Sequence, residues 1–269
     1  MSHFKVKQIY PWLYSIKELD AFCYLIIGQE KALLFDAVYG LYNLREVVEE
    51  ITDKPYVVVL GHGHIDHVNA APQFESVMIH KADINLYYEH SSPIYRENVL
   101  KARGRGLPDD YDKDGYLNAK QDNLIPLEDG MSFDLGGINV DVVEMAGHTA
   151  GSIGILIREH SVLLTSDSAC SHVWLYLDES LPLRDYIAML ERVILLPFDT
   201  VMVGHSDEPQ DKTVFQRYID VAKNVDISKS KPYAPFADRP ELKGWFYEED
   251  GIGIVVKEDN MYQREVWMN

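Results

Sequence analysis

The chain has 269 residues, of which 46% are hydrophobic and 25% are charged, and its 25 basic and 43 acidic side chains give a formal net charge of -18. This composition is typical of a folded globular protein and excludes the disordered and fibrous classes. The negative charge repels phosphate backbones and anionic lipid surfaces, so we expect neither a nucleic-acid partner nor a membrane partner.

The first part of the chain predicts a layered α/β unit. Short apolar runs separated by turn signals indicate consecutive antiparallel strands, at residues 4–10, 13–16, 23–28 and 32–37. A helical pattern follows at residues 41–51, and the β-branched run at 56–60 predicts a further strand that ends at Gly61.

The middle of the chain, around residues 81–123, is predicted to be a helical and loop insertion. Residues 81–102 have a helical pattern that breaks near Ser92 and Pro93, and residues 103–116 are polar and rich in turn formers. A loop of this length often covers a binding site, so we expect the insertion to influence substrate choice as a lid.

The last part alternates predicted strands and helices. Strands are expected at residues 138–146, 153–159, 161–166 and 199–204, helices at 183–196 and 213–225, and late strands at 244–247, 251–257 and 264–268. Neither an internal repeat nor a low-complexity linker interrupts this pattern, so one domain is predicted across residues 1–269.

Two cysteines, Cys23 and Cys170, are few for a chain of this size, which favours reduced thiols. The first residues do not have the pattern of a secretory signal, and no apolar run reaches membrane-spanning length. We therefore expect a cytosolic location. Cys170 is predicted to be a small buried hydrophobic side chain rather than a nucleophile.

The segment after the strand at 56–60 gathers four potential metal ligands, His62, His64, Asp66 and His67. Imidazole and carboxylate are ligands that zinc accepts readily, and the glycines beside the histidines allow close turns. Asp66 is also a candidate N-cap for a helix that begins at His67.

Three more ligand-type residues follow predicted strands. They are His148 in the segment AGHTAGS, Asp167 after SVLLTS, and His205 after DTVMVG. Strand ends and the loops after them are where layered α/β proteins build their sites.

The segments HGHIDH, GHTAGS, TSD and VGHS, in that order between residues 62 and 205, resemble the metallo-β-lactamase superfamily. The preceding LLFDA, with Asp36, is similar to the early strand-end aspartate of the family. The resemblance implies an α/β fold, a four-layer αβ/βα sandwich, with a two-metal site at one edge.

Carried onto this chain, the resemblance implies that one metal is held by His62, His64 and His148. The second is held by Asp66, His67 and His205, with Asp167 bridging both. The ligand set favours two zinc ions, with iron or manganese as alternatives.

Such a site implies hydrolysis in which a metal-bound hydroxide attacks a carbonyl carbon, while Asp66 orients the nucleophile and passes a proton to the leaving group. With Asp167 and the full HxHxDH set, the chain resembles glyoxalase II-type thioesterases and lactonases, and this resemblance implies an ester, thioester or lactone of a small molecule as substrate. β-Lactam or phosphodiester hydrolysis is the alternative within the hydrolases. A diiron redox protein and a metal-bearing sensor are alternatives of other classes.

Two further features have both a functional and a structural interpretation. The aromatic residues Tyr87, Tyr88, Trp174 and Tyr176 are either substrate contacts or ordinary packing residues. The acidic loop that begins at Asp110 places Asp112, Asp114 and Gly115 at calcium-loop spacing but ends on Gln121 instead of glutamate. It is therefore either a weak calcium site or a solvated acidic turn.

Overall fold

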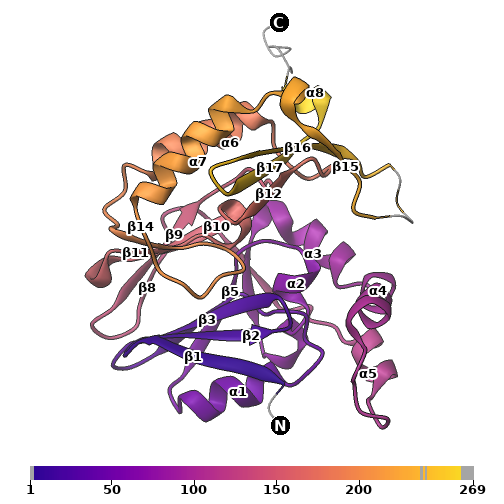
Figure 1. Cartoon of the computed structure of the whole chain (residues 1–269). Helices are drawn as coiled ribbons and strands as arrows, with labels where there is room; N and C mark the ends of the chain where they lie inside the picture. Colours follow the sequence, from indigo (N-terminus) through magenta and orange to yellow (C-terminus); the bar gives the residue numbers. More distant parts are fainter. Residues whose placement is uncertain (1–2, 237–238, 240, 262–269) are drawn as a thin grey trace, which may run out of the picture. The chain divides into compact units, whose positions relative to one another are not determined.

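The computed structural model describes residues 3–236, 239 and 241–261. The chain, drawn as a ribbon in Figure 1, divides into two compact units, Met1–Val142 and Val143–Asn269. Each unit has its own core. The single domain expected across residues 1–269 stays a prediction, and each unit is described by itself below.

Unit 1 is built on a seven-stranded sheet in which the strands are neighbours in sequence order. The pairs from β1 to β4 are antiparallel and the pairs from β4 to β7 are parallel. The strands are β1 (Phe4–Tyr10), β2 (Leu13–Glu18), β3 (Ala21–Ile27), β4 (Ala32–Phe35), β5 (Tyr56–Leu60), β6 (Val77–His80) and β7 (Leu124–Leu127).

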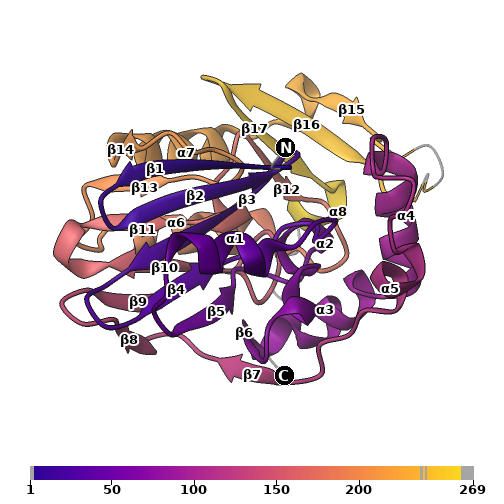
Figure 2. The same cartoon turned by 90° about the horizontal axis from the view of Figure 1, so that it is seen from below.

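The helices of unit 1 lie in the connections between its parallel strands. They are α1 (Leu44–Ile51), α2 (Ile65–Val68), α3 (Ile84–His90), α4 (Pro93–Arg103) and α5 (Lys113–Asn118). Helix α1 begins at the N-cap Asn43 and buries Leu44 and Val48 in the core that it shares with the sheet. Helices α3, α4 and α5 follow one another between β6 and β7 (Figure 2).

Strand β5 shows how the sequence positions the first motif. Its last three residues, from Val58 to Leu60, are buried, as expected for a parallel strand that is covered on both faces. The chain then leaves the sheet at Gly61, and the motif histidines lie on the connection that follows the carboxyl end of the strand.

Glu18, at the end of β2, is a buried carboxyl group that holds the loop after β4. Its two oxygens accept hydrogen bonds from the backbone N–H groups of Gly40 at 2.8 Å and Tyr42 at 3.0 Å. Burial raises the pKa of Glu18 from 4.5 to about 7, although these N–H donors act in the opposite direction.

This shift predicts a pH-dependent stability. The folded state retains a proton on Glu18 between the unfolded pKa of 4.5 and the folded pKa of about 7, whereas the unfolded state loses it. The contribution to the free energy of unfolding, about 3 kcal/mol, is therefore present below pH 4.5 and lost as the pH rises through 7. Urea unfolding at pH 5 and pH 8 measures how much the free energy of unfolding falls with pH. This fall should be smaller in Glu18→Gln than in the wild type. Equal differences in the two proteins would contradict this role.

Unit 2 contains two sheets. One runs in the order β14-β13-β11-β10-β9, and the other in the order β12-β17-β16-β15. The first comprises β9 (Asn139–Glu144), β10 (Ile153–Ile157), β11 (Val162–Leu164), β13 (Thr200–Met202) and β14 (Gln210–Asp211). The second comprises β12 (His172–Leu175), β15 (Lys231–Tyr233), β16 (Gly244–Glu249) and β17 (Ile252–Val256). Strand β9 begins in unit 1, where it pairs with β8 (Ser132–Asp134).

Helices α6 (Leu183–Val193) and α7 (Thr213–Asn224) lie side by side in unit 2 (Figure 1). A short helix, α8 (Glu258–Met261), follows β17. Helix α6 buries Tyr186, Leu190 and Val193, which recur at the three- and four-residue spacing of one helical face. These side chains join the core of unit 2.

Most predicted elements are confirmed, including the helical break at Ser92 and Pro93. The polar stretch at residues 103–116 is not entirely loop, because α5 begins within it at Lys113. The strand predicted at 264–268 lies outside the described residues. Both cysteines are buried, which agrees with the small buried side chain predicted at Cys170. Within the described ranges, none of the helices is long and apolar enough to cross a membrane, and the cytosolic location stays a prediction.

Candidate metal centre

In unit 1 the ligand-type residues of the first motif lie on one short connection. The ring centroids of His62 and His64 are 4.7 Å apart, and those of His62 and His67 are 4.2 Å apart. All three histidines are at least nine-tenths buried. Asp66 lies beside them, with 3.5 Å between its Oδ2 and the Nε2 of His67.

Asp36 fixes both ends of this connection. Its Oδ1 accepts the backbone N–H of Gly61 at 2.6 Å, and its Oδ2 lies 2.9 Å from the Nδ1 of His67. A carboxylate at Nδ1 places the ring proton there, so the Nε2 of His67 carries a lone pair suited to a metal. The early strand-end aspartate therefore orients a candidate ligand.

Two residues that the sequence did not single out also hold the connection. The Oδ2 of Asp83 accepts the N–H of Gly63 at 2.9 Å, and the Nδ1 of His90 accepts the N–H of Ile65 at 3.2 Å. The His90 ring also stacks on His64, with 4.8 Å between the ring centroids. A Cβ atom at Gly63 would lie 2.9 Å from the backbone nitrogen of Tyr87, so glycine permits this close approach to α3.

The structure corrects the capping role predicted for Asp66. Helix α2 begins at Ile65 and its N-cap is His64, so Asp66 lies inside the first turn. A carboxylate there still benefits from the positive end of the helix. Its predicted roles as a ligand and a proton carrier stay predictions.

In unit 2, His148 is held in a defined tautomer. Its Nδ1 lies 2.9 Å from the carbonyl oxygen of Trp174, and because a carbonyl only accepts, Nδ1 must carry the proton. The Nε2 of His148 then carries the lone pair, as in His67. The His148 carbonyl in turn accepts the Ser180 hydroxyl at 2.9 Å.

Asp167 lies close to both unit 2 histidines. Its Oδ2 is 3.8 Å from the Nε2 of His148, and its carboxylate is 3.2 Å from the Nε2 of His205. The sequence predicted these three as ligands, and unit 2 brings them to one place.

The two loops that carry His205 and Asp167 each contain a residue with a strained backbone. His205 itself has a φ of 57°, and Ser166, just before Asp167, has a φ of 45°. Non-glycine residues adopt this left-handed region at a cost, and such strain is often found at functional sites. A Cβ atom at Gly204 would lie 2.5 Å from the Ser166 carbonyl oxygen, so only glycine allows the two loops this approach.

Tyr186 on α6 supports two of the unit 2 turns at once. Its hydroxyl donates to the Ser168 carbonyl at 2.9 Å, next to Asp167. Its ring also packs closely against Gly147, the residue before His148, because a Cβ atom added at Gly147 would lie only 2.6 Å from the ring. The sequence predicted the helix but contained no signal for this role.

Together the predicted ligands are imidazole nitrogens and carboxylate oxygens, which are donors that divalent zinc, iron and manganese accept. The proton positions in His67 and His148 fit the same use, because each ring presents Nε2 as the ligand atom. The residues of each unit therefore fit metal coordination.

The four predicted substrate aromatics differ in exposure. Tyr87 is 1% exposed and Tyr176 is 0% exposed, and each packs in the core of its own unit. Tyr88 is 46% exposed on α3, and Trp174 is partly buried on β12. Burial favours the packing interpretation for Tyr87 and Tyr176, while substrate contact stays a prediction for Tyr88 and Trp174.

The acidic loop leads into a helix, and its calcium binding stays a prediction. Asp112 is the N-cap of α5, and its side chain accepts the N–H of Gly115 at 2.8 Å. Within the described ranges, Asp110, Asp112 and Asp114 do not converge as a ligand group. The capped helix therefore favours the second interpretation, a solvated acidic turn.

Comparison with known proteins identifies relatives of the chain. It is 24% identical to the protein named "Probable polyketide biosynthesis zinc-dependent hydrolase BaeB" of Bacillus velezensis over 84% of this chain and 91% of that protein. It is 26% identical to the human acyl-coenzyme A thioesterase MBLAC2 over 68% of this chain and 71% of that protein. It is 30% identical to the hydroxyacylglutathione hydrolase GloC of Haemophilus influenzae over 54% of this chain and 65% of that protein.

Solved structures confirm the predicted fold class, α/β of the metallo-β-lactamase type. A metallo-β-lactamase from Pontibacter korlensis matches with a TM-score of 0.59 and 15% identity over 82% of this chain and all of that chain. An archaeal superfamily protein from Sulfolobus tokodaii matches with a TM-score of 0.56 and 18% identity over 85% of this chain and 92% of that chain. The model of the metallo-beta-lactamase superfamily matches residues 16–205 of this chain. Since that span is more than half of the sequence, the chain belongs to the metallo-β-lactamase superfamily, and it is a hydrolase of that superfamily.

Proposed function

We propose that the protein is a binuclear zinc hydrolase that cleaves an ester, thioester or lactone bond of a small molecule. The observation that carries the proposal is the fixed tautomer of His67 and His148, whose Nδ1 atoms face a carboxylate and a carbonyl, respectively. Histidines held in this way present Nε2 to a metal ion.

The ligand assignment follows the family pattern residue by residue. His62, His64 and His148 would hold one ion, and Asp66, His67 and His205 the other, with Asp167 between the two. The short distances from Asp167 to His148 and His205 within unit 2 support the bridging role. When bound, a metal pair lowers the pKa of a bound water molecule and polarises the substrate carbonyl.

Asp66 is the proposed proton carrier. It is partly exposed, whereas the neighbouring His67 is buried, so among these two residues Asp66 has access to a leaving group. A carboxylate in that position would orient the attacking water molecule, accept a proton from it and pass that proton to the departing oxygen or sulfur.

The substrate class rests on the relatives. Among them, MBLAC2 is named as an acyl-coenzyme A thioesterase and GloC as a hydroxyacylglutathione hydrolase. This agreement favours a thioester over a β-lactam or phosphodiester for this chain. A diiron redox protein remains the rival of another class, and metal analysis of protein purified without added metal distinguishes it by dominant iron and oxygen consumption.

A substrate panel tests the proposal. Zinc-loaded protein should hydrolyse acyl thioesters or lactones faster than β-lactams and phosphodiesters, and His148→Ala should lower that rate at least about a hundredfold, because one metal loses a ligand. His160→Ala in the same unit is the matched control and should retain the rate. Hydrolysis that survives His148→Ala would refute the assigned metal role.

A further inference from the structure

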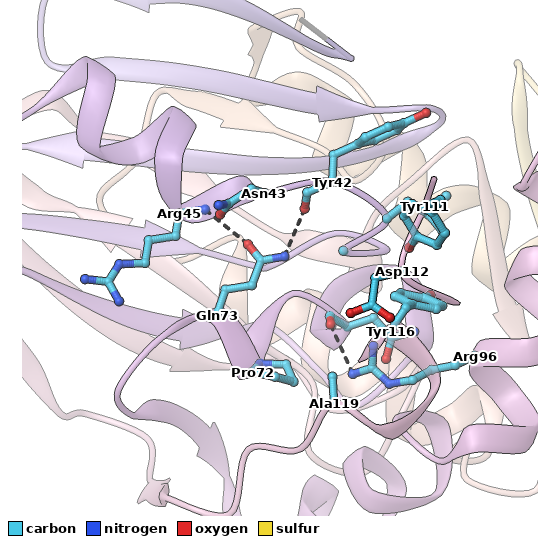
Figure 3. A pocket seen from close by; sticks show the side chains of 13 residues that line it. Tyr42, Asn43, Arg45, Pro72, Gln73, Arg96, Tyr111, Asp112, Tyr116 and Ala119 are labelled. Carbon is cyan, nitrogen blue, oxygen red and sulfur yellow. Dashed lines mark hydrogen bonds between the residues drawn. The ribbon is translucent and has the colours of Figure 1, made fainter. Parts of the chain in front are cut away.

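Unit 1 contains a cavity, here called the Arg96 cavity, that includes none of the seven predicted metal ligands in its lining. Its volume is about 550 Å³, which is within the range of small-molecule sites. The lining residues used below are Tyr42, Asn69, Arg96, Tyr111, Asp112 and Tyr116. Figure 3 shows Arg96, Tyr116 and Asp112 gathered at one end of the cavity, while the Arg45 side chain points away at the other.

Arg96 is a fully buried cation, with 0% exposure. Its Nε donates to the Ser91 carbonyl at 3.0 Å and one terminal nitrogen donates to the Asn69 carbonyl at 3.1 Å. These two bonds use two of the five guanidinium N–H donors. The guanidinium also lies over the Tyr116 ring, 5.0 Å from its centroid. Among the described residues no carboxylate forms an ion pair with Arg96, although buried charges are normally paired.

Asn69 provides a second, independent observation. Its side chain is 2% exposed, and neither polar atom of its amide makes a hydrogen bond to the described residues. The Tyr116 hydroxyl lies near this amide but donates its hydrogen bond to the Tyr39 carbonyl at 3.1 Å. A buried amide without such a bond is costly, and a ligand with acceptor oxygens would remove that cost.

We propose that the Arg96 cavity binds a small organic carboxylate. The carboxylate oxygens accept hydrogen bonds from the Arg96 guanidinium and the Asn69 amide, and the planar part of the molecule packs against the rings of Tyr42 and Tyr111. The fork of N–H donors in a guanidinium matches a carboxylate in two-point geometry. A single buried cation, with the acidic Asp112 also in the lining, suits a monoanion better than a dianion such as phosphate.

Calorimetric titration of the zinc-loaded full chain tests this proposal with three probes. Sodium benzoate should bind, while its neutral isostere benzamide and inorganic phosphate should each bind at least about tenfold more weakly. Phosphate that binds more tightly than benzoate, or benzamide that binds equally well, would refute a carboxylate site. The absence of benzoate binding at millimolar concentration would refute any site.

Variants locate the binding. Asn69→Asp keeps the side-chain shape but places a carboxylate beside the buried cation, so benzoate affinity should fall at least about tenfold while the melting temperature is maintained or raised. Arg96→Lys retains the positive charge but loses the forked N–H donors of the guanidinium, so it should also weaken benzoate binding. This second variant keeps the test usable if Asn69→Asp does not fold. His148→Ala should leave benzoate affinity unchanged. Loss of binding in His148→Ala with retention in Asn69→Asp would assign the carboxylate to the metal centre and overturn the proposal, while leaving the hydrolase function intact.

Discussion

Replacing Asp167 with alanine should lower hydrolysis at least about a thousandfold and remove metal from the purified protein. The carboxylate lies 3.2 Å from the Nε2 of His205 and 3.8 Å from that of His148, so it is the negative group shared by the unit 2 ligands. A metal pair contributes several kcal/mol to transition-state stabilisation, and about 1.4 kcal/mol corresponds to a factor of ten in rate. Metal content by mass spectrometry and the initial rate of thioester hydrolysis measure both effects.

The matched control for Asp167 is Asp185→Ala. Asp185 lies on α6 in the same unit, is exposed, and forms an ion pair with the neighbouring Arg184 at 3.4 Å. This variant should retain full metal content and activity. If Asp167→Ala retained two metals per chain and hydrolysed at the wild-type rate, the bridging assignment would be wrong.

The second large effect is expected at Asp36. Alanine there removes the acceptor of the Gly61 N–H and the partner of the His67 Nδ1, both in the buried interior. An unpaired buried N–H group costs about 1–3 kcal/mol, and loss of the group that orients a metal-bound histidine typically costs about 10–100-fold in metal affinity. Urea unfolding of metal-free protein measures the first effect, and competition with a chromophoric zinc chelator measures the second.

Asp36→Asn is the informative companion variant. Asp36 has a φ of 70°, which asparagine tolerates better than alanine does, and the amide oxygen can still accept the Gly61 N–H. This variant should therefore recover most of the stability but not the zinc affinity, because the amide no longer offers a carboxylate to His67. Full zinc affinity in both variants would show that Asp36 serves only the fold.

The sequence predicted the elements with strong periodicity and the residues that follow them. Strand β5 and helix α6 have clear apolar patterns, so both ends of β5 and the start of α6 could be located. His62 and His148 lie just after predicted strands. Helix α5 was missed because it is polar and contains Gly115. It is stabilised instead by the Asp112 cap and by the buried Tyr116.

The supporting contacts could not be predicted, because they join residues that are distant in sequence. Asp83 and Gly63 are 20 positions apart, and His90 and Ile65 are 25 apart. An aspartate and a histidine in a polar segment have no local pattern that indicates such pairing. Only the folded arrangement of α3 against the first motif shows their role.

The contacts of Asp83 and His90 also limit how this protein can be recombined with its relatives. The predicted insertion begins near residue 81, and its first turns carry the acceptors for the backbone of the metal-binding motif. If the whole insertion from the end of β6 were replaced with that of a relative, these acceptors would be exchanged together with the outer helices. If only the part between His90 and β7 were replaced, the motif would keep its own acceptors, and only α4, α5 and the loop between them would be transferred.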